Sequence, residues 1–282
     1  MHGQNAESSE TPAAGTGPKG SSKAWWRFRR DVRGEWRGLK RSLLTWRTGL
    51  WLLAGVLAYG LMARFLDGRS LEGMSAFYRA NPNGEAKELA AVCQWFNQAG
   101  DFVYTVLIFL GLLCAHSLWK SAYLRRLAVG VLISSLLVGA AARVGKVLLG
   151  RARPRTVIHY KCEPWYCKGP TLNPDYHSFP SGHTSFAAAG SGPLLMAEPL
   201  VGLPLTLGTL FIGGSRIGGM YHHPSDVLAG LWLGSLVGCA SGLRLRRLSR
   251  RAKRLAAYRR GRGVGAVPSF ALPKPELGKL VP

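Results

Sequence analysis

Two histidines and an aspartate within one stretch of this chain could carry out phosphoryl transfer. His222 and Asp226 are four residues apart, so on a helix they would share one face. The carboxylate could then hold one imidazole nitrogen and leave the other lone pair free to attack phosphorus. His183 is the candidate general acid. These residues predict a phosphatase with a histidine nucleophile.

The same stretch contains groups that could bind the phosphoryl oxygens. Three cationic side chains could surround a phosphoryl group, while a serine and a backbone amide could add hydrogen bonds. These candidate phosphate ligands are Lys146, Arg153, Arg216, Ser181 and Gly182. Because the cations already supply positive charge, we expect no metal ion and no other cofactor.

The candidate residues fall into three clusters, at 146–154, 180–183 and 215–226. These clusters resemble the signature of the type 2 phosphatidic acid phosphatase (PAP2) superfamily, which also includes vanadium haloperoxidases. That signature is Lys, six residues, Arg-Pro; then Pro-Ser-Gly-His; then Ser-Arg, five residues, His, three residues, Asp. Segments 146–154, 180–183 and 215–226 match it at every fixed position. The resemblance implies a phosphohistidine on His222, leaving-group protonation by His183, orientation of His222 by Asp226, and phosphate binding by the five ligands named above.

Long apolar runs predict an all-α fold, a six-transmembrane-helix bundle of the PAP2/haloperoxidase type. Several runs approach the roughly 17–25 residues that a spanning helix needs. For the two shortest, the alternative is a buried helical pair in a soluble protein. The last run carries glycines at four-residue spacing, which allow close approach between membrane helices. The six predicted spans are 50–66, 102–119, 127–142, 184–197, 200–214 and 227–243, and the glycines are Gly230, Gly234, Gly238 and Gly242.

The net charge of +23 lies mostly at the two ends of the chain. Residues 19–47 and 244–262 each contain ten lysines or arginines, and the short loop 120–126 contains three more. The positive-inside rule therefore places both termini and this loop in the cytoplasm. Nucleic-acid binding by the arginine-rich tail is the competing interpretation, but membrane orientation and anionic lipid headgroups account for the charge without it.

Counting spans from the cytoplasm places all three clusters at exterior helix ends. If the number of spans between them differed by one, the phosphate ligands and the nucleophile would lie on opposite faces of the bilayer, roughly 30 Å apart. We therefore expect a multi-pass protein of a bacterial plasma (inner) membrane with a periplasmic or exterior active site. Its partners would be the membrane and a lipid phosphate substrate; the sequence does not indicate an oligomeric state.

Composition divides the chain into four predicted parts. Residues 1–22 are a disordered cytoplasmic tail, and 23–48 are a basic amphipathic cytoplasmic segment suited to the membrane surface. The six-span phosphatase domain occupies 49–243, and 244–282 form a basic and then flexible cytoplasmic tail. The long exterior loop 65–101 contains a predicted helix over 85–96, and one hypothesis is that this loop covers the site.

Two features of the exterior segments leave alternatives open. Cys162 and Cys167 could form a disulfide in an oxidising compartment, with two free thiols as the alternative. Additional cations surround the first cluster and could bind a second phosphate or face water; they are Arg151, Arg155, Lys161 and Lys168.

The family resemblance suggests several substrates, namely undecaprenyl diphosphate, phosphatidylglycerol phosphate, phosphatidate and lipid A phosphate. A lipid phosphotransferase is the main alternative, because an acceptor hydroxyl and water can both attack phosphohistidine. A vanadate-dependent haloperoxidase and a non-catalytic lipid-binding protein are further alternatives. The expected reaction is metal-independent hydrolysis of a lipid phosphate or diphosphate.

Overall fold

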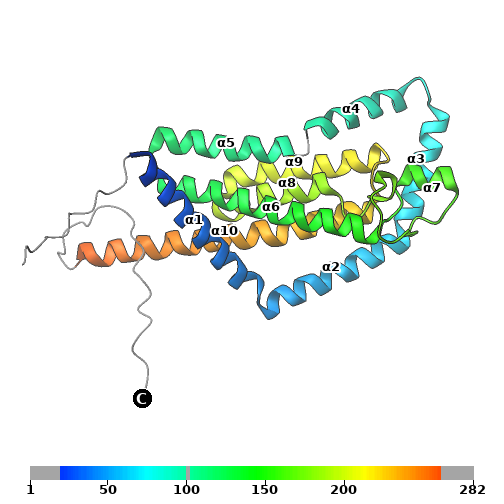
Figure 1. Ribbon diagram of the computed structural model, residues 1–282. Helices are drawn as coiled ribbons and strands as arrows, with labels where there is room; N and C mark the ends of the chain where they lie inside the picture. Colours follow the sequence, from blue (N-terminus) through cyan, green and yellow to red (C-terminus); the bar gives the residue numbers. More distant parts are fainter. Residues whose placement is uncertain (1–19, 100–101, 262–282) are drawn as a thin grey trace, which may run out of the picture.

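The computed structural model describes residues 20–99 and 102–261, and this part of the chain is built from helices (Figure 1). Within it there is no β-strand, only an isolated bridge between Arg151 and Cys167. The predicted all-α bundle is confirmed, whereas the outer parts of both predicted tails lie outside the described residues. The helices are α1 (Gly20–Leu43), α2 (Trp46–Phe65), α3 (Asp67–Ala80), α4 (Glu85–Ala99), α5 (Phe102–Trp119), α6 (Ala122–Leu149), α7 (Pro154–Tyr160), η1 (Pro174–Tyr176), α8 (Gly182–Ala197), α9 (Pro199–Gly218) and α10 (Pro224–Gly261).

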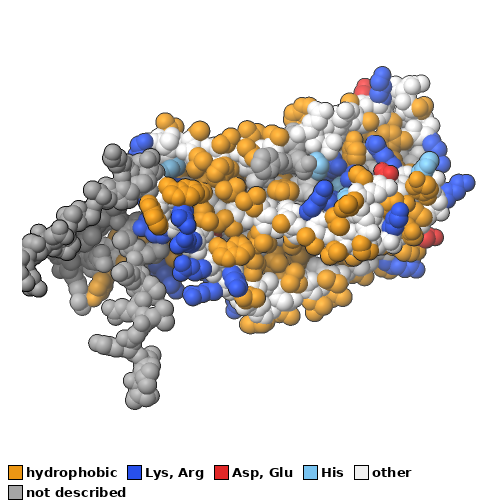
Figure 2. Space-filling view, viewed as in Figure 1, with side chains coloured by type: hydrophobic (Ala, Val, Ile, Leu, Met, Phe, Trp, Pro, Cys, Tyr) orange, Lys and Arg blue, Asp and Glu red, His pale blue; other side chains and the backbone are white. Residues whose placement is uncertain are grey.

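Several helices are suited to cross a membrane. By length and hydropathy, α2, α6, α9 and α10 qualify among the described residues, and the bent pair α4 and α5 would make a fifth span. Hydrophobic side chains cover the middle of the face shown in Figure 2, while lysines and arginines gather toward its ends. The fourth predicted span, 184–197, corresponds to α8, a helix of 16 residues inside the bundle that does not qualify by this measure. The count of six therefore stays a prediction.

Helix α8 lies at the centre of the bundle and packs against α5, α6, α9 and α10. The predicted glycine stripe of α10 faces α8 so closely that a Cβ atom at any of its positions would collide with main-chain oxygen atoms. The facing pairs are Gly230 with Ser181, Gly234 with Ser185, Gly238 with Ala189, and Gly242 with Pro193. This contact confirms the predicted close approach and fixes the start of α8 beside the start of α10.

The first cluster follows a sharp turn at the end of α6. Gly150 has φ +56°, a left-handed conformation that favours glycine, and its N–H bonds to the Lys146 carbonyl. The chain then leads into α7, which begins at Pro154. Proline is tolerated there because the first N–H groups of a helix have no partner within the helix. Local sequence thus terminates one helix and starts the next on either side of Arg153.

Helix α1 is fastened to α6 and α10 by its two acidic residues. Asp31 pairs with Arg125 at 2.8 Å and Arg126 at 3.7 Å. Glu35 pairs with Arg244 and accepts a hydrogen bond from Ser241 at 2.9 Å. Because these carboxylates face the bundle, the exposed surface of α1 keeps the cationic and tryptophan-rich character expected from the sequence.

Candidate active site

The predicted site residues meet at one end of the bundle. Lys146 lies in the last turn of α6, and Arg216 lies near the end of α9. Ser181, Gly182 and His183 start α8, where the first backbone amides have no partner within the helix. Arg153 precedes α7, His222 precedes α10, and Asp226 lies in the first turn of α10. The three clusters therefore come together at four helix ends, namely the end of α6, the start of α8, the end of α9 and the start of α10.

His222 is a buried imidazole whose tautomer follows from its neighbour. Its Nδ1 lies 2.7 Å from the Ser178 carbonyl oxygen. Since a carbonyl can only accept, Nδ1 carries the proton and Nε2 keeps the lone pair. Burial lowers the pKa of His222 well below its usual value, and Lys146, Arg216 and Arg153 lower it further. A neutral ring beside three cations is the form that a nucleophile for an anionic substrate requires.

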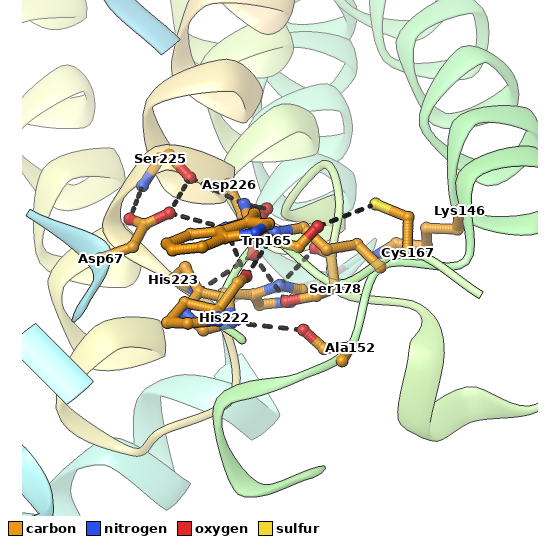
Figure 3. Close-up of polar contacts among 12 residues, drawn as sticks. Asp67, Lys146, Ala152, Trp165, Cys167, Ser178, His222, His223, Ser225 and Asp226 are labelled. Carbon is orange, nitrogen blue, oxygen red and sulfur yellow. Dashed lines mark hydrogen bonds and ion pairs between the residues drawn. The ribbon is translucent and has the colours of Figure 1, made fainter. Parts of the chain in front are cut away.

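Asp226 does not hold His222 directly, contrary to the expectation from their spacing. Its carboxylate accepts from Arg151 at 2.5 Å, from the Ser178 hydroxyl at 2.6 Å and from the His223 backbone N–H at 3.0 Å. The helical argument was wrong because α10 begins at Pro224, so His222 lies in the preceding loop and does not share a helical face with Asp226. The two residues are linked through Ser178, whose hydroxyl reaches Asp226 and whose carbonyl reaches His222 (Figure 3).

Arg151 is a buried structural cation. It is 1% exposed and lies between two carboxylates, with Nη2 2.6 Å from Asp67 and Nη1 2.5 Å from Asp226. Neither alternative left open for Arg151, a second phosphate or water, fits this burial. Removing one partner of a buried ion pair costs about 3–5 kcal/mol, because the other charge is left uncompensated.

Asp67 and Asn97 are site residues that the sequence motifs do not contain. Asp67 starts α3 directly after the first apolar run, and an acid at that boundary was the only local signal. Asn97 lies on α4, where no pattern marks it. Its carbonyl lies 3.2 Å from His183 Nε2, and its side-chain oxygen accepts from Arg216. The hypothesis that the 65–101 segment reaches the site agrees with these contacts.

His183 is held in a strongly cationic environment. Burial, followed by Arg216, Lys146 and Arg153, lowers the pKa of His183 to about 3, although the bond to the Asn97 carbonyl opposes this shift. The free protein therefore carries a neutral His183 over the ordinary pH range. A bound anion would counter the same cations and favour the protonated form.

The candidate phosphate ligands are oriented by backbone oxygens and ring faces. Lys146 donates to the His177 carbonyl at 2.8 Å, and Arg153 Nε donates to the Pro174 carbonyl at 2.9 Å. Arg216 lies over the Tyr221 ring at 4.3 Å from its centroid. The Lys146 Cε would lie 3.5 Å from a Cβ at Gly182, so this cation reaches the start of α8.

Ser181 is fully buried and contributes to packing as well as to the candidate site. Its backbone N–H donates to the Asp226 carbonyl at 3.0 Å, and its hydroxyl lies 2.9 Å from that of Thr184. His223 is also buried, with Nε2 3.2 Å from the Ala152 carbonyl, so it packs against the first cluster. A small pocket next to His222 is lined by α3, the end of α9 and the loop before α10.

Of the two alternatives left open for Cys162 and Cys167, the structure has the two free thiols and no disulfide between them. The backbone of Cys167 pairs with Arg151, and its Sγ contacts the Trp165 carbonyl at 3.5 Å. Cys162 instead bonds to the end of α7 through its N–H and the Val157 carbonyl. Each cysteine is therefore held in place by its own backbone contacts. Over the described residues, no three His, Cys, Asp or Glu side chains are grouped as metal ligands.

Comparison with known proteins finds a similar family over the part of the chain that contains these clusters. Residues 123–248 match the PAP2 superfamily. The chain is 32% identical to a probable lipid phosphate phosphatase 4 of Arabidopsis thaliana over 41% of its own length and 46% of the relative. It is 25% identical to a lipid A 1-phosphatase of Rhizobium johnstonii over 53% of its length and 64% of the relative. It is 41% identical to the undecaprenyl-diphosphatase BcrC of Bacillus subtilis over 22% of its length and 32% of the relative.

The chain therefore spans less than two thirds of each of these relatives. No solved structure is significantly similar to it.

Proposed function

We propose that this protein hydrolyses a phosphate or diphosphate group on a membrane lipid, because residues 123–248 match the PAP2 superfamily. The observation that carries the proposal is His222, a buried imidazole with Nδ1 bonded to the Ser178 carbonyl and three cations lowering its pKa. This arrangement leaves Nε2 free for attack on a group that Lys146, Arg153 and Arg216 attract.

In the proposed first step, Nε2 of His222 forms a bond to phosphorus as the bond to the leaving oxygen breaks. Lys146, Arg153 and Arg216 stabilise charge on the equatorial oxygens. His183 gives its proton to the leaving oxygen, and the Asn97 contact must open to release its Nε2 for this role. The products of this step are a lipid alcohol, or a lipid monophosphate from a diphosphate, and phosphohistidine.

In the second step, water attacks the phosphohistidine and gives a proton to His183, now neutral. The bond between phosphorus and Nε2 breaks, inorganic phosphate leaves, and both histidines return to their starting forms. Asp226 acts on His222 through Ser178, which keeps Nδ1 protonated during both steps. No step needs a metal ion.

The membrane setting supports a lipid as the phosphate carrier. The middle of the bundle is apolar, and the basic parts of α1 and α10 lie away from the site end, which agrees with the positive-inside rule for an exterior site (Figures 1 and 2). A periplasmic site in a bacterial plasma membrane is part of the proposal. Lysine and arginine at helix ends suit the depth of lipid headgroups and avoid the bilayer centre.

One observation favours a diphosphate among the candidate lipids. Arg155 lies 4.7 Å from the centroid of the same Tyr221 ring that contacts Arg216, and it donates to the Gly219 carbonyl at 3.0 Å. This exposed and oriented cation lies beside the inner cations, where a second phosphate would extend. The relative from Bacillus subtilis is named an undecaprenyl-diphosphatase, whereas that from Rhizobium johnstonii is named a lipid A 1-phosphatase.

Release of inorganic phosphate by the purified full chain tests the proposal. The panel contains undecaprenyl diphosphate and undecaprenyl phosphate as a matched pair, with phosphatidylglycerol phosphate, phosphatidate and lipid A phosphate. We expect release without any added acceptor and in the presence of EDTA. Release only when an acceptor lipid is present would instead identify a phosphotransferase.

The control compares two neighbouring histidines. We expect His222→Ala to reduce turnover at least about 10³-fold, as loss of a covalent nucleophile does. His223→Ala should keep measurable activity, because the bond from its backbone N–H to Asp226 survives the substitution. The reverse pattern would show that His223 is the nucleophile.

A further inference from the structure

Asp67 lies outside all three motifs and outside the matched family region, yet its carboxylate is buried at the site. It is 0% exposed and begins α3. Its Oδ1 accepts from the Ser225 backbone N–H at 3.0 Å. Its Oδ2 accepts from the Ser225 hydroxyl at 2.5 Å (Figure 3). The same oxygen accepts from Arg151 Nη2 at 2.6 Å.

These bonds connect Asp67 to the first turn of α10 by two routes. Through Ser225, the carboxylate satisfies a backbone N–H that the helix start leaves without an internal partner. Through Arg151, it shares a cation with Asp226. Burial alone would lower the pKa of Arg151, but Asp226, Tyr59 and Asp67 raise it, so the guanidinium stays charged.

The connection continues from Asp226 to the nucleophile. Ser178 donates its hydroxyl to Asp226 at 2.6 Å and accepts from His222 Nδ1 at 2.7 Å. The three side chains Asp67, Arg151 and Asp226 are each at most 1% exposed, so water does not replace any of these bonds. Removing the Asp67 charge would leave Arg151 with Asp226 as its one carboxylate and free the start of α10 to shift.

We propose that Asp67 is a positioning residue, which fixes the ring of His222 through Arg151, Ser225, Asp226 and Ser178. This inference rests on the proposed function. It assigns to α3 a part in the reaction, although α3 precedes the matched domain. It also explains why the first acidic residue after α2 is buried instead of facing solvent.

Loss of a positioning residue and loss of a purely structural residue should weaken the binding of different ligands. Orthovanadate must bond to Nε2 of His222 to adopt the geometry of the transition state, so its binding depends on the orientation of this ring. Sulfate cannot form this bond, so its binding depends on the surrounding phosphate-binding groups and not on the orientation of the His222 ring. A misoriented His222 should therefore weaken vanadate and leave sulfate unchanged, whereas a disordered site should weaken both.

The test measures kcat, KM and the inhibition constants of vanadate and sulfate for the full chain and Asp67→Asn. We expect kcat to fall at least about tenfold with KM within about threefold of wild type, as loss of orientation predicts. The vanadate constant should rise at least about tenfold, while that of sulfate changes less than about threefold. Glu72→Gln is the matched control, since it removes an exposed carboxylate from the same helix and should match wild type.

Unchanged kcat in Asp67→Asn, or an equal loss of vanadate and sulfate binding, would overturn the inference. If Asp67→Asn does not fold, Ser225→Ala tests the same link, because it removes a hydroxyl that contacts both Asp67 and Arg151 without changing any charge. It should show the same split between the two inhibitors, and the absence of a split would refute the role. A wild-type protein that releases phosphate from no lipid would contradict the proposed function instead.

Discussion

The protonation state of His183 is the most demanding requirement at the scale of single residues. A general acid must be protonated when substrate is bound, yet burial and three neighbouring cations hold the pKa of this residue at about 3 in the free protein. A dianion among those cations reverses the local potential and raises this pKa. His183 should therefore take up a proton when an anion binds. The affinity for the anion should fall as pH rises from the pKa of His183 in the free protein to its higher pKa in the complex.

Inhibition by sulfate as a function of pH checks this expectation, because the charge of sulfate stays constant over the range. We expect the inhibition constant to increase by up to about tenfold per pH unit over part of the range from about pH 5 to 8. The increase should vanish in His183→Gln. A constant value in wild type, or the same slope in His183→Gln, would show that His183 is not the group that gains the proton.

His222 and His183 could be singled out as candidates because their motifs are local in sequence. The groups that orient His222 could not, since they come from residues 67, 151 and 178, which meet only in the folded chain. The spacing of His222 and Asp226 suggested a direct bond, but the helix begins two residues after His222. The sequence alone also does not distinguish an arginine that binds phosphate from one, such as Arg151, that is buried in an ion pair.

At the scale of helices, the contact between α8 and α10 determines where the clusters lie relative to one another. The glycine stripe lets the α10 backbone touch α8, and this brings Ser181 within 3.0 Å of Asp226. The stripe was recognisable in the sequence because it repeats at the helical period. The helical pair α3 and α4 was harder to predict, since only 85–96 carried a helical pattern.

Substitution of one stripe glycine should damage the site from a distance. In Gly234→Ala, the added methyl group would collide with the Ser185 carbonyl and the Ala188 side chain. We expect a loss of about 1–3 kcal/mol in the free energy of unfolding, as overpacking produces, with reduced phosphate release. Unfolding in detergent and phosphate release measure the two effects.

Gly214→Ala is the matched control because nothing lies within 4 Å of a Cβ at that position of α9. It should be neutral or stabilise the protein by up to about 1 kcal/mol, because alanine favours the helix. Equal effects of the two substitutions would show that the α8–α10 contact is not as close as the structure describes.

At the scale of the whole molecule, charge and hydropathy predicted more than any single helix boundary. Segregated apolar runs indicated an all-α membrane bundle, and the clusters meet at the ends of the runs that flank the motifs. The boundaries were less predictable, since the apolar run 227–243 and the basic segment after it form one continuous helix, α10. The short apolar run of α8 was predicted as a span, and in the structure this helix packs at the centre of the bundle.

The central claim is that phosphate passes through a covalent bond to His222. The most direct measurement is rapid quenching in base of a reaction with lipid carrying radioactive phosphate, followed by tryptic digestion. We expect base-stable, acid-labile label on the peptide that begins after Arg216, and no label in His222→Ala. Normal phosphate release without labelled protein at any quench time, or label that persists in His222→Ala, would contradict the claim.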